Sequence, residues 1–165
     1  MFILVQVYVL NKIPHLHQFI VPYLYFLFLL WLPFGISRIG LLVVGFLTGL
    51  ALDFFTMTPG LHAAACVLLA YCRPFVINIL TPKDPNEFNY REPSPRAMGW
   101  TPYLVYALVL TIVHHGYLVL LEWLSFGSFF GFLVKVASTS AISMLLIIAT
   151  EMLFPRRMKF RTNIA

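Results

Sequence analysis

Long apolar runs separated by short polar or proline-containing breaks follow one another along the chain. They predict helices at about 1–10, 20–34, 39–55, 60–80, 102–123 and 128–154. A helix needs roughly 20 apolar residues to span a bilayer, which the last four runs approach or exceed. Because the runs are continuous and do not alternate with polar residues, they favour helices over the strands of a membrane barrel. The sequence therefore predicts an all-α polytopic membrane protein, with residues 1–165 forming a single six-helix transmembrane bundle.

The first two runs are shorter than the rest. Residues 1–10 supply half of a spanning helix, so we expect this first helix to be truncated and translation to begin upstream. A secretory signal peptide fits poorly, because the run has no basic segment before it and no small-residue cleavage site after it. The second run is bounded by Pro22 and Pro33.

Composition supports a membrane location. Hydrophobic residues make up 61% of the 165 residues and charged residues 10%, whereas a water-soluble domain carries about 25% charged residues to wet its surface. The mean hydropathy is +0.88. These values exclude a water-soluble globular domain.

Basic residues are concentrated in alternate loops. One set of loops, with the C-terminal tail, contains eight of the eleven lysines and arginines, namely Arg38, Lys83, Arg91, Arg96, Arg156, Arg157, Lys159 and Arg161. Because cytoplasmic loops carry an excess of basic residues, we expect both termini in the cytoplasm and the turn at 56–59 on the outer side. Anionic lipid accounts for the net charge of +5, so membrane lipid is the expected charged partner and nucleic acid is not.

The one long polar interruption is the loop at 81–101, which contains four prolines and interspersed acidic and basic residues. It is expected to be a stiff cytoplasmic connector. Its aromatic residues Phe88, Tyr90 and Trp100 leave open a second interpretation, a docking surface for a cytoplasmic partner. Trp100 also suits an anchor at the membrane interface.

The most specific polar feature is a turn flanked by Asp53 and His62, with Pro59 and Gly60 between them. An ionisable side chain at the edge of the bilayer's hydrocarbon costs about 2 kcal/mol or more unless it is paired or packed inward. Asp53 is therefore expected to have a partner or a function.

Small and polar residues recur at helical spacing near this turn. Gly45 and Gly49 precede Asp53 at intervals of four, a stripe that lets a neighbouring helix approach closely and that turns Asp53 into the bundle. Arg73 is expected to extend toward the cytoplasmic interface. Lys135, on the last helix, is expected in the same outer half of the bundle as Asp53.

Three interpretations of this outer polar region remain open. Asp53 could cap or pair across its turn, with His62 or Lys135, and lock the helix hairpin. The region could instead bind a small solute from outside, or carry out chemistry. Chemistry is disfavoured because the sequence contains no nucleophile elbow, phosphate loop or paired catalytic carboxylates. No cofactor is expected, and no metal, since adjacent His114 and His115 diverge by about 100 degrees on a helix.

Several of these residues carry a family resemblance. Gly49-x-x-x-Asp53-Phe54, a short turn and Pro59-Gly60-x-His62-Ala-Ala, in a chain of this length, resemble the rod-shape-determining membrane protein family MreD. The segments 6–11 and 70–75 resemble that family too, and the likeness covers most of the chain. The lost proline in the turn at 35–38 and the short first helix depart from the family's pattern.

The resemblance implies a non-enzymatic scaffold of the cell-elongation machinery in the bacterial inner (cytoplasmic) membrane. Its implied partners are an MreC-like membrane protein, a RodA-like polymerase with its transpeptidase, and, indirectly, MreB-like filaments. The family's fold resembles the substrate-binding component of energy-coupling-factor transporters, so a vitamin-binding component is the alternative. For the scaffold, we expect the glycine faces at Gly45 and Gly49 to dock the transmembrane helix of the MreC-like partner.

Overall fold

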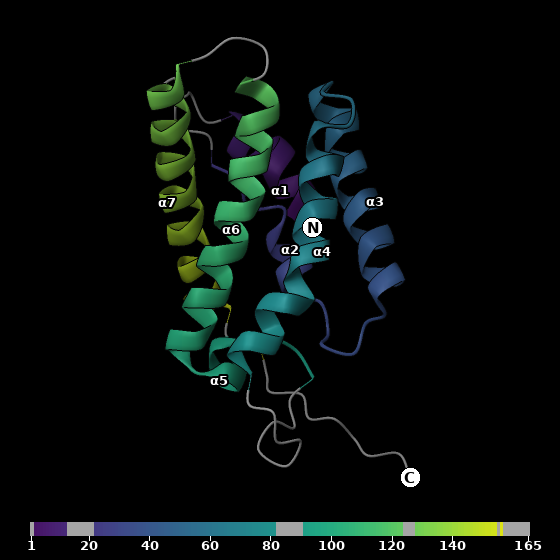
Figure 1. Ribbon diagram of the computed structural model, residues 1–165, viewed down its shortest axis with the longest axis vertical. Helices are drawn as coiled ribbons and strands as arrows, with labels where there is room; N and C mark the ends of the chain where they lie inside the picture. The colour runs from purple at the N-terminus through teal and green to yellow at the C-terminus, as the bar shows by residue number, and fades with distance from the viewer. Residues whose placement is uncertain (1, 13–21, 82–90, 124–127, 155, 157–165) are drawn as a thin grey trace.

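Within the part of the chain that the structure describes, four long helices form the frame of the molecule (Figure 1). The computed structural model describes residues 2–12, 22–81, 91–123, 128–154 and 156. Each of the long helices is long and apolar enough to cross a membrane. They are α3 (Arg38–Thr56), α4 (Leu61–Leu80), α6 (Trp100–Trp123) and α7 (Phe129–Leu153). The shorter elements are α1 (Phe2–Tyr8), η1 (Leu10–Lys12), α2 (Leu27–Leu30) and α5 (Pro95–Met98), and no strand occurs among the described residues.

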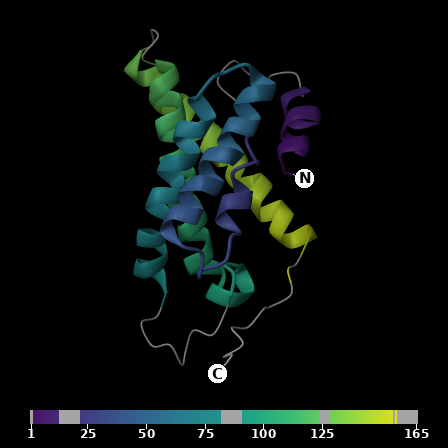
Figure 2. The same ribbon diagram turned by 90° about the vertical axis from the view of Figure 1, so that its right-hand side faces the viewer.

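The long helices pack side by side in chain order. α4 lies between α3 and α6, and α7 packs against α6. The turn between α3 and α4 lies at the same end as the last turn of α6 and the first turn of α7, while α5 lies at the opposite end (Figure 1). Figure 2 shows that α7 is inclined to the other three long helices. The all-helical prediction is confirmed for the described residues, and the long helices begin and end close to the predicted positions.

Local capping explains where these helices begin and end. Ser37 accepts a hydrogen bond from the backbone N–H of Gly40, and Ser128 accepts one from Gly131, so each serine satisfies a free donor in the first turn of its helix. At the end of α3, Met57 adopts a left-handed conformation with φ of 55°. Only a short turn is then needed to reverse the chain into α4.

The second predicted helix differs from the structure, and the six-helix count is not supported. Residues 2–12 form a short apolar helix made of α1 and η1. In the described part of the predicted helix at 20–34, only α2 is helical. As a helix those 15 residues would reach about 22 Å at 1.5 Å per residue, short of the roughly 30 Å of bilayer hydrocarbon.

The segment 22–34 nevertheless runs the length of the bundle. Tyr25 contacts His62 near the α3–α4 turn, and Trp31 contacts Glu151 near the opposite end. Irregular backbone at membrane depth is tolerated where protein surrounds it, and five residues of this segment are fully buried: Tyr25, Phe26, Leu27, Leu29 and Leu30. The segment therefore follows the long axis of the bundle without being a continuous helix.

Gln6 of α1 holds the start of this segment. Its side-chain nitrogen donates to the Pro22 carbonyl at 2.9 Å and to Asn11, and its oxygen accepts the Leu24 N–H at 2.8 Å. Gln6 is itself fully buried. One side chain thus replaces two of the backbone partners that a helix would have supplied.

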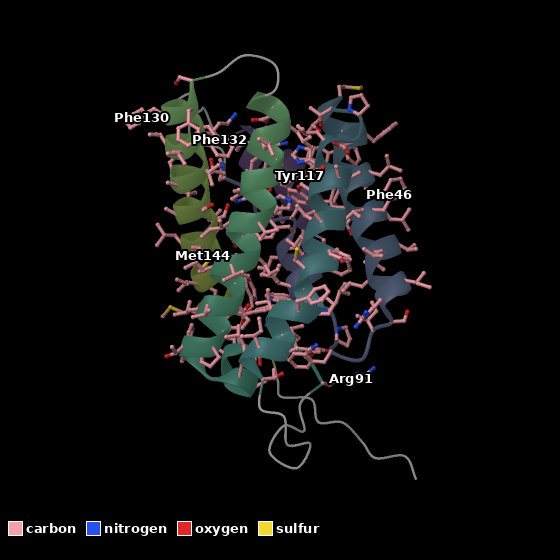
Figure 3. The ribbon with its side chains drawn as sticks, viewed as in Figure 1. Phe46, Arg91, Tyr117, Phe130, Phe132 and Met144 are labelled. Carbon is pink, nitrogen blue, oxygen red and sulfur yellow. The ribbon has the colours of Figure 1, made fainter. Side chains whose placement is uncertain are left out.

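Side chains sort to the inside and the outside of the long helices. In Figure 3, Phe46 on α3 and Phe130 on α7 point outward, while Tyr117, Phe132 and Met144 lie between helices. Phe46 is 47% exposed and Phe130 is 76% exposed. Large exposed apolar residues on a spanning helix suit lipid or another transmembrane helix.

Candidate functional site

Asp53 caps the neighbouring helix. Its Oδ1 accepts the backbone N–H of His62 at 2.9 Å and the Thr58 hydroxyl at 3.0 Å, and its Oδ2 accepts the N–H of Ala63 at 2.9 Å. The carboxylate is 3% exposed. A carboxylate at a helix N-terminus also faces the positive end of the helix dipole. Of the arrangements that the sequence left open for Asp53, local capping describes the geometry.

With Asp53 in place, the first turn of α4 has no free donor. The N–H of Leu61 donates to the Thr58 carbonyl and that of Ala64 to the Gly60 carbonyl, while Asp53 takes the two N–H groups between them. Gly60 is the N-cap residue, with φ of 87°, and offers no side chain for this role. Asp53 on α3 supplies the cap that the N-cap residue lacks.

The glycine stripe of α3 faces α4. A Cβ at Gly49 would lie 2.4 Å from the Cα of Ala63, and one at Gly45 would lie 3.0 Å from the Cβ of Ala70. Both glycines are buried. The prediction that these faces dock a partner helix is therefore corrected, because α4 already occupies them.

A chain of hydrogen-bonded side chains crosses the bundle below this cap. Tyr25 Oη lies 2.9 Å from His62 Nδ1 and 2.8 Å from His114 Nε2. His114 Nδ1 lies 3.0 Å from His115 Nδ1, and His115 Nε2 lies 2.9 Å from Ser143 Oγ. We call these five residues the histidine chain. The histidine chain joins three long helices, α4, α6 and α7, and the segment that precedes α2.

The histidine chain is completely enclosed. Tyr25, His114, His115 and Ser143 are fully buried, and His62 is 3% exposed. If each imidazole is neutral, one hydrogen can be assigned to every contact, running either from His62 to Ser143 or in the reverse direction. Each link then satisfies a polar group whose burial alone would cost about 1–3 kcal/mol.

Aromatic rings fill the space around these imidazoles. Phe26 stacks on His114 with ring centroids 4.7 Å apart, and Tyr23 packs on His62 and on His115 at 5.6 Å each. His114 and His115 are adjacent on α6, so their Cβ atoms diverge as expected for a helix. Their ring nitrogens are in hydrogen-bonding contact, because χ rotation brings the neighbouring rings together despite their divergent Cβ directions.

Arg73 lies inside the bundle, contrary to the expectation that it would extend to the interface. It is 1% exposed. Its Nε donates to Tyr106 Oη at 2.9 Å and its Nη2 donates to the Leu32 carbonyl, while Tyr106 donates to the Leu30 carbonyl at 2.9 Å. The carbonyls at and beyond the end of α2 attract the guanidinium, which explains its burial.

Lys135 pairs with Glu122 and not with Asp53. The pair joins the first two turns of α7 to the last turn of α6. Both side chains are partly exposed, at 28% for Lys135 and 30% for Glu122. Among the predicted site residues, Pro59 and Gly60 form the exposed turn before α4.

Tyr25 and Ser143 are part of the histidine chain. Neither residue was predicted from the sequence. Each stands in a long apolar run with no charged neighbour or recognisable spacing. The number of histidines on facing helices was the available signal, since buried imidazoles require hydroxyl or carbonyl partners. Among the described residues, no group of three His, Cys, Asp or Glu side chains is arranged to hold a metal ion.

Comparison with known proteins adds no relative. The chain matches no protein-family model, no curated protein and no solved structure.

Proposed function

We propose that this chain is a non-enzymatic scaffold of the bacterial cell-elongation machinery, a member of the MreD family that holds other membrane proteins in place. It would dock an MreC-like protein and a RodA-like polymerase with its transpeptidase, and connect indirectly to MreB-like filaments. The support is the motif resemblance together with the part that the motif residues play in this fold.

The observation that carries the proposal is the internal use of the motif. Gly49 admits α4, and Asp53 accepts three hydrogen bonds from its own chain. His62 contributes its backbone to that cap and its ring to the histidine chain. A motif whose polar atoms are bonded within the molecule favours a rigid platform over an enzyme, since catalysis needs polar groups directed at a substrate.

The vitamin-binding alternative finds less support. A solute site needs a cavity with polar groups directed into it. Near His62 and His115 the space is taken by Tyr23 and by hydrogen bonds among the side chains themselves.

The distribution of charge supports the proposed orientation. Arg38 begins α3, and Arg91 and Arg96 flank the start of α5, so these cations gather at the end of the bundle opposite the α3–α4 turn (Figures 1 and 3). Arg156 follows the end of α7 there. By the positive-inside bias, we assign this end of the bundle to the cytoplasm and the Asp53 cap to the outer side.

The outward face of α7 is the proposed docking surface. Of the most apolar stretch of α7, 22% is buried inside the molecule, against 33% for α3 and α4 and 44% for α6. Ala137 and Ala141, four residues apart, are both exposed on it, with Leu133 and Leu145 exposed beside them. Small residues at this spacing allow the close approach on which transmembrane association relies. We assign this face to the single transmembrane helix of an MreC-like partner.

Co-purification from a rod-shaped bacterium's native membrane tests the proposal. The wild-type chain should recover the MreC-like protein and the RodA-like polymerase. Ala137→Leu with Ala141→Leu should reduce recovery and round the cells. Ala149→Leu, which places the same larger residue on another exposed part of α7, is the control. Recovery of transporter ATPases, or vitamin uptake that depends on the chain, would support the alternative instead.

A further inference from the structure

A cavity of about 330 Å³ lies where the first turn of α6 meets the last turn of α7. Its lining includes Ser94, Arg96, Trp100, Glu151, Met152 and Arg156. α6 and α7 are both candidate membrane spans, so the cavity lies at the level where a span ends. Trp100, 49% exposed at the first position of α6, suits the aromatic belt of that interface.

The cavity contains one cation held rigidly in place. The guanidinium of Arg156 lies 4.1 Å from the ring centre of Trp31, and its Nη2 donates to Glu151 and to the Pro93 carbonyl at 2.7 Å each. Its Nε is buried without a hydrogen-bond partner. The guanidinium is therefore a fixed positive charge in the lining of the cavity, and 15% of the Arg156 side chain remains exposed.

The negative charge of Glu151 does not neutralise the positive charge of the cavity lining. Its Oε1 accepts hydrogen bonds from Trp31 and Tyr103 as well as from Arg156. The carboxylate is thus occupied by three donors of its own chain. Exposed Arg96 also lines the cavity, so the two lining arginines exceed the one lining carboxylate by one positive charge.

We propose that this cavity binds the phosphate of an anionic phospholipid headgroup. The phosphate would lie against the exposed part of the Arg156 side chain, Arg96 would neutralise the remaining charge, and the acyl chains would leave past Met152, which is 69% exposed on α7. Basic pockets between membrane helices bind anionic headgroups in this way. Free phosphate offers the same oxygen atoms, but the membrane-interface position and the apolar exit favour lipid.

Native mass spectrometry of the full-length chain, released from detergent with added lipid, tests the proposal. Phosphatidylglycerol should stay bound at lower concentration than phosphatidylcholine of the same acyl chains. Arg96→Gln should weaken phosphatidylglycerol binding about fivefold, the effect of one basic residue at an anionic surface. Arg156→Gln should weaken it further, but it also breaks the Glu151 contact, so Arg96→Gln carries the test if Arg156→Gln does not fold.

Arg38→Gln is the matched control, because Arg38 is exposed at the same end of the bundle and does not line the cavity. An equal loss of binding in Arg38→Gln would show a general effect of surface charge and overturn the proposal. Equal retention of phosphatidylcholine would also overturn it. Displacement of phosphatidylglycerol by millimolar inorganic phosphate would reassign the cavity to free phosphate.

Discussion

Gly49 on α3 packs directly against Ala63 on α4, so closely that a Cβ added at position 49 would lie 2.4 Å from the Ala63 Cα. The neighbouring atoms are backbone atoms of α4, which cannot move aside by a change of rotamer. The separation of α3 and α4 at their shared turn is therefore set by the absence of a side chain.

Gly49→Ala is expected to force the two helices apart, whereas Gly45→Ala meets Ala70 and the Cys66 carbonyl at 3.0 Å and needs a smaller adjustment. We expect losses of about 3 kcal/mol for Gly49→Ala and about 1 kcal/mol for Gly45→Ala, within the range for overpacked cores. Unfolding in mixed micelles of increasing denaturing detergent measures both. Gly116→Ala, where a Cβ meets nothing within 4 Å, should not destabilise. Equal effects at 45 and 49 would contradict the proposed packing.

Asp53→Asn is expected to destabilise the hairpin. The amide keeps the shape but has one acceptor oxygen, so either the His62 or the Ala63 N–H loses its partner, at a cost of about 1–3 kcal/mol. Thr58→Ala removes only a donor to this carboxylate and should cost less. The same unfolding assay ranks the two variants. A fully stable Asp53→Asn variant would show that the cap does not hold the hairpin.

Tyr25→Phe is expected to interrupt the histidine chain. The phenol oxygen is the shared contact of His62 and His114, and its loss leaves two buried ring nitrogens without this partner. We expect a loss of about 1–3 kcal/mol. Tyr71→Phe, at a position 58% exposed, is the matched control and should be neutral. If both variants unfold alike, the histidine chain contributes nothing to stability.

Arg73→Lys is expected to loosen the segment 22–34 even though it keeps the charge. One ammonium group cannot reproduce the separate bonds of the guanidinium to Tyr106 and to the Leu32 carbonyl. Amide hydrogen exchange in peptides covering 22–34 should become faster while that of α7 stays unchanged. Arg38→Gln, at an exposed arginine, should leave both rates at wild-type values.

The sequence predicted the long helices and the importance of Asp53 for the same reason: both produce strong local signals. An apolar run of spanning length has few alternatives in lipid, and a carboxylate at the edge of such a run requires a partner. Capping was among the expected arrangements because the turn is short. The actual donors, two backbone N–H groups, depend on Gly60 leaving the cap position empty.

The interior contacts could not be read from the sequence. The segment 22–34 has the composition of a helix, and its irregular path depends on Gln6, Arg73 and Tyr106, which lie far from it in the chain. Arg73 was expected at the interface because an arginine near a helix end usually reaches water. Its burial follows only once the carbonyls of the irregular segment are known to lie beside it.

The irregular segment has a consequence for the order of assembly during synthesis. Carbonyls at its end are bonded by Arg73 and Tyr106, whose partners precede them by 41 and 76 residues in the chain. Residues 22–34 leave the ribosome before those donors exist, and their backbone is not satisfied in lipid by its own helix. The segment 22–34 is therefore expected to settle only after α4 and α6 are in place, so a stretch that is synthesised before its partners is among the last to reach its position.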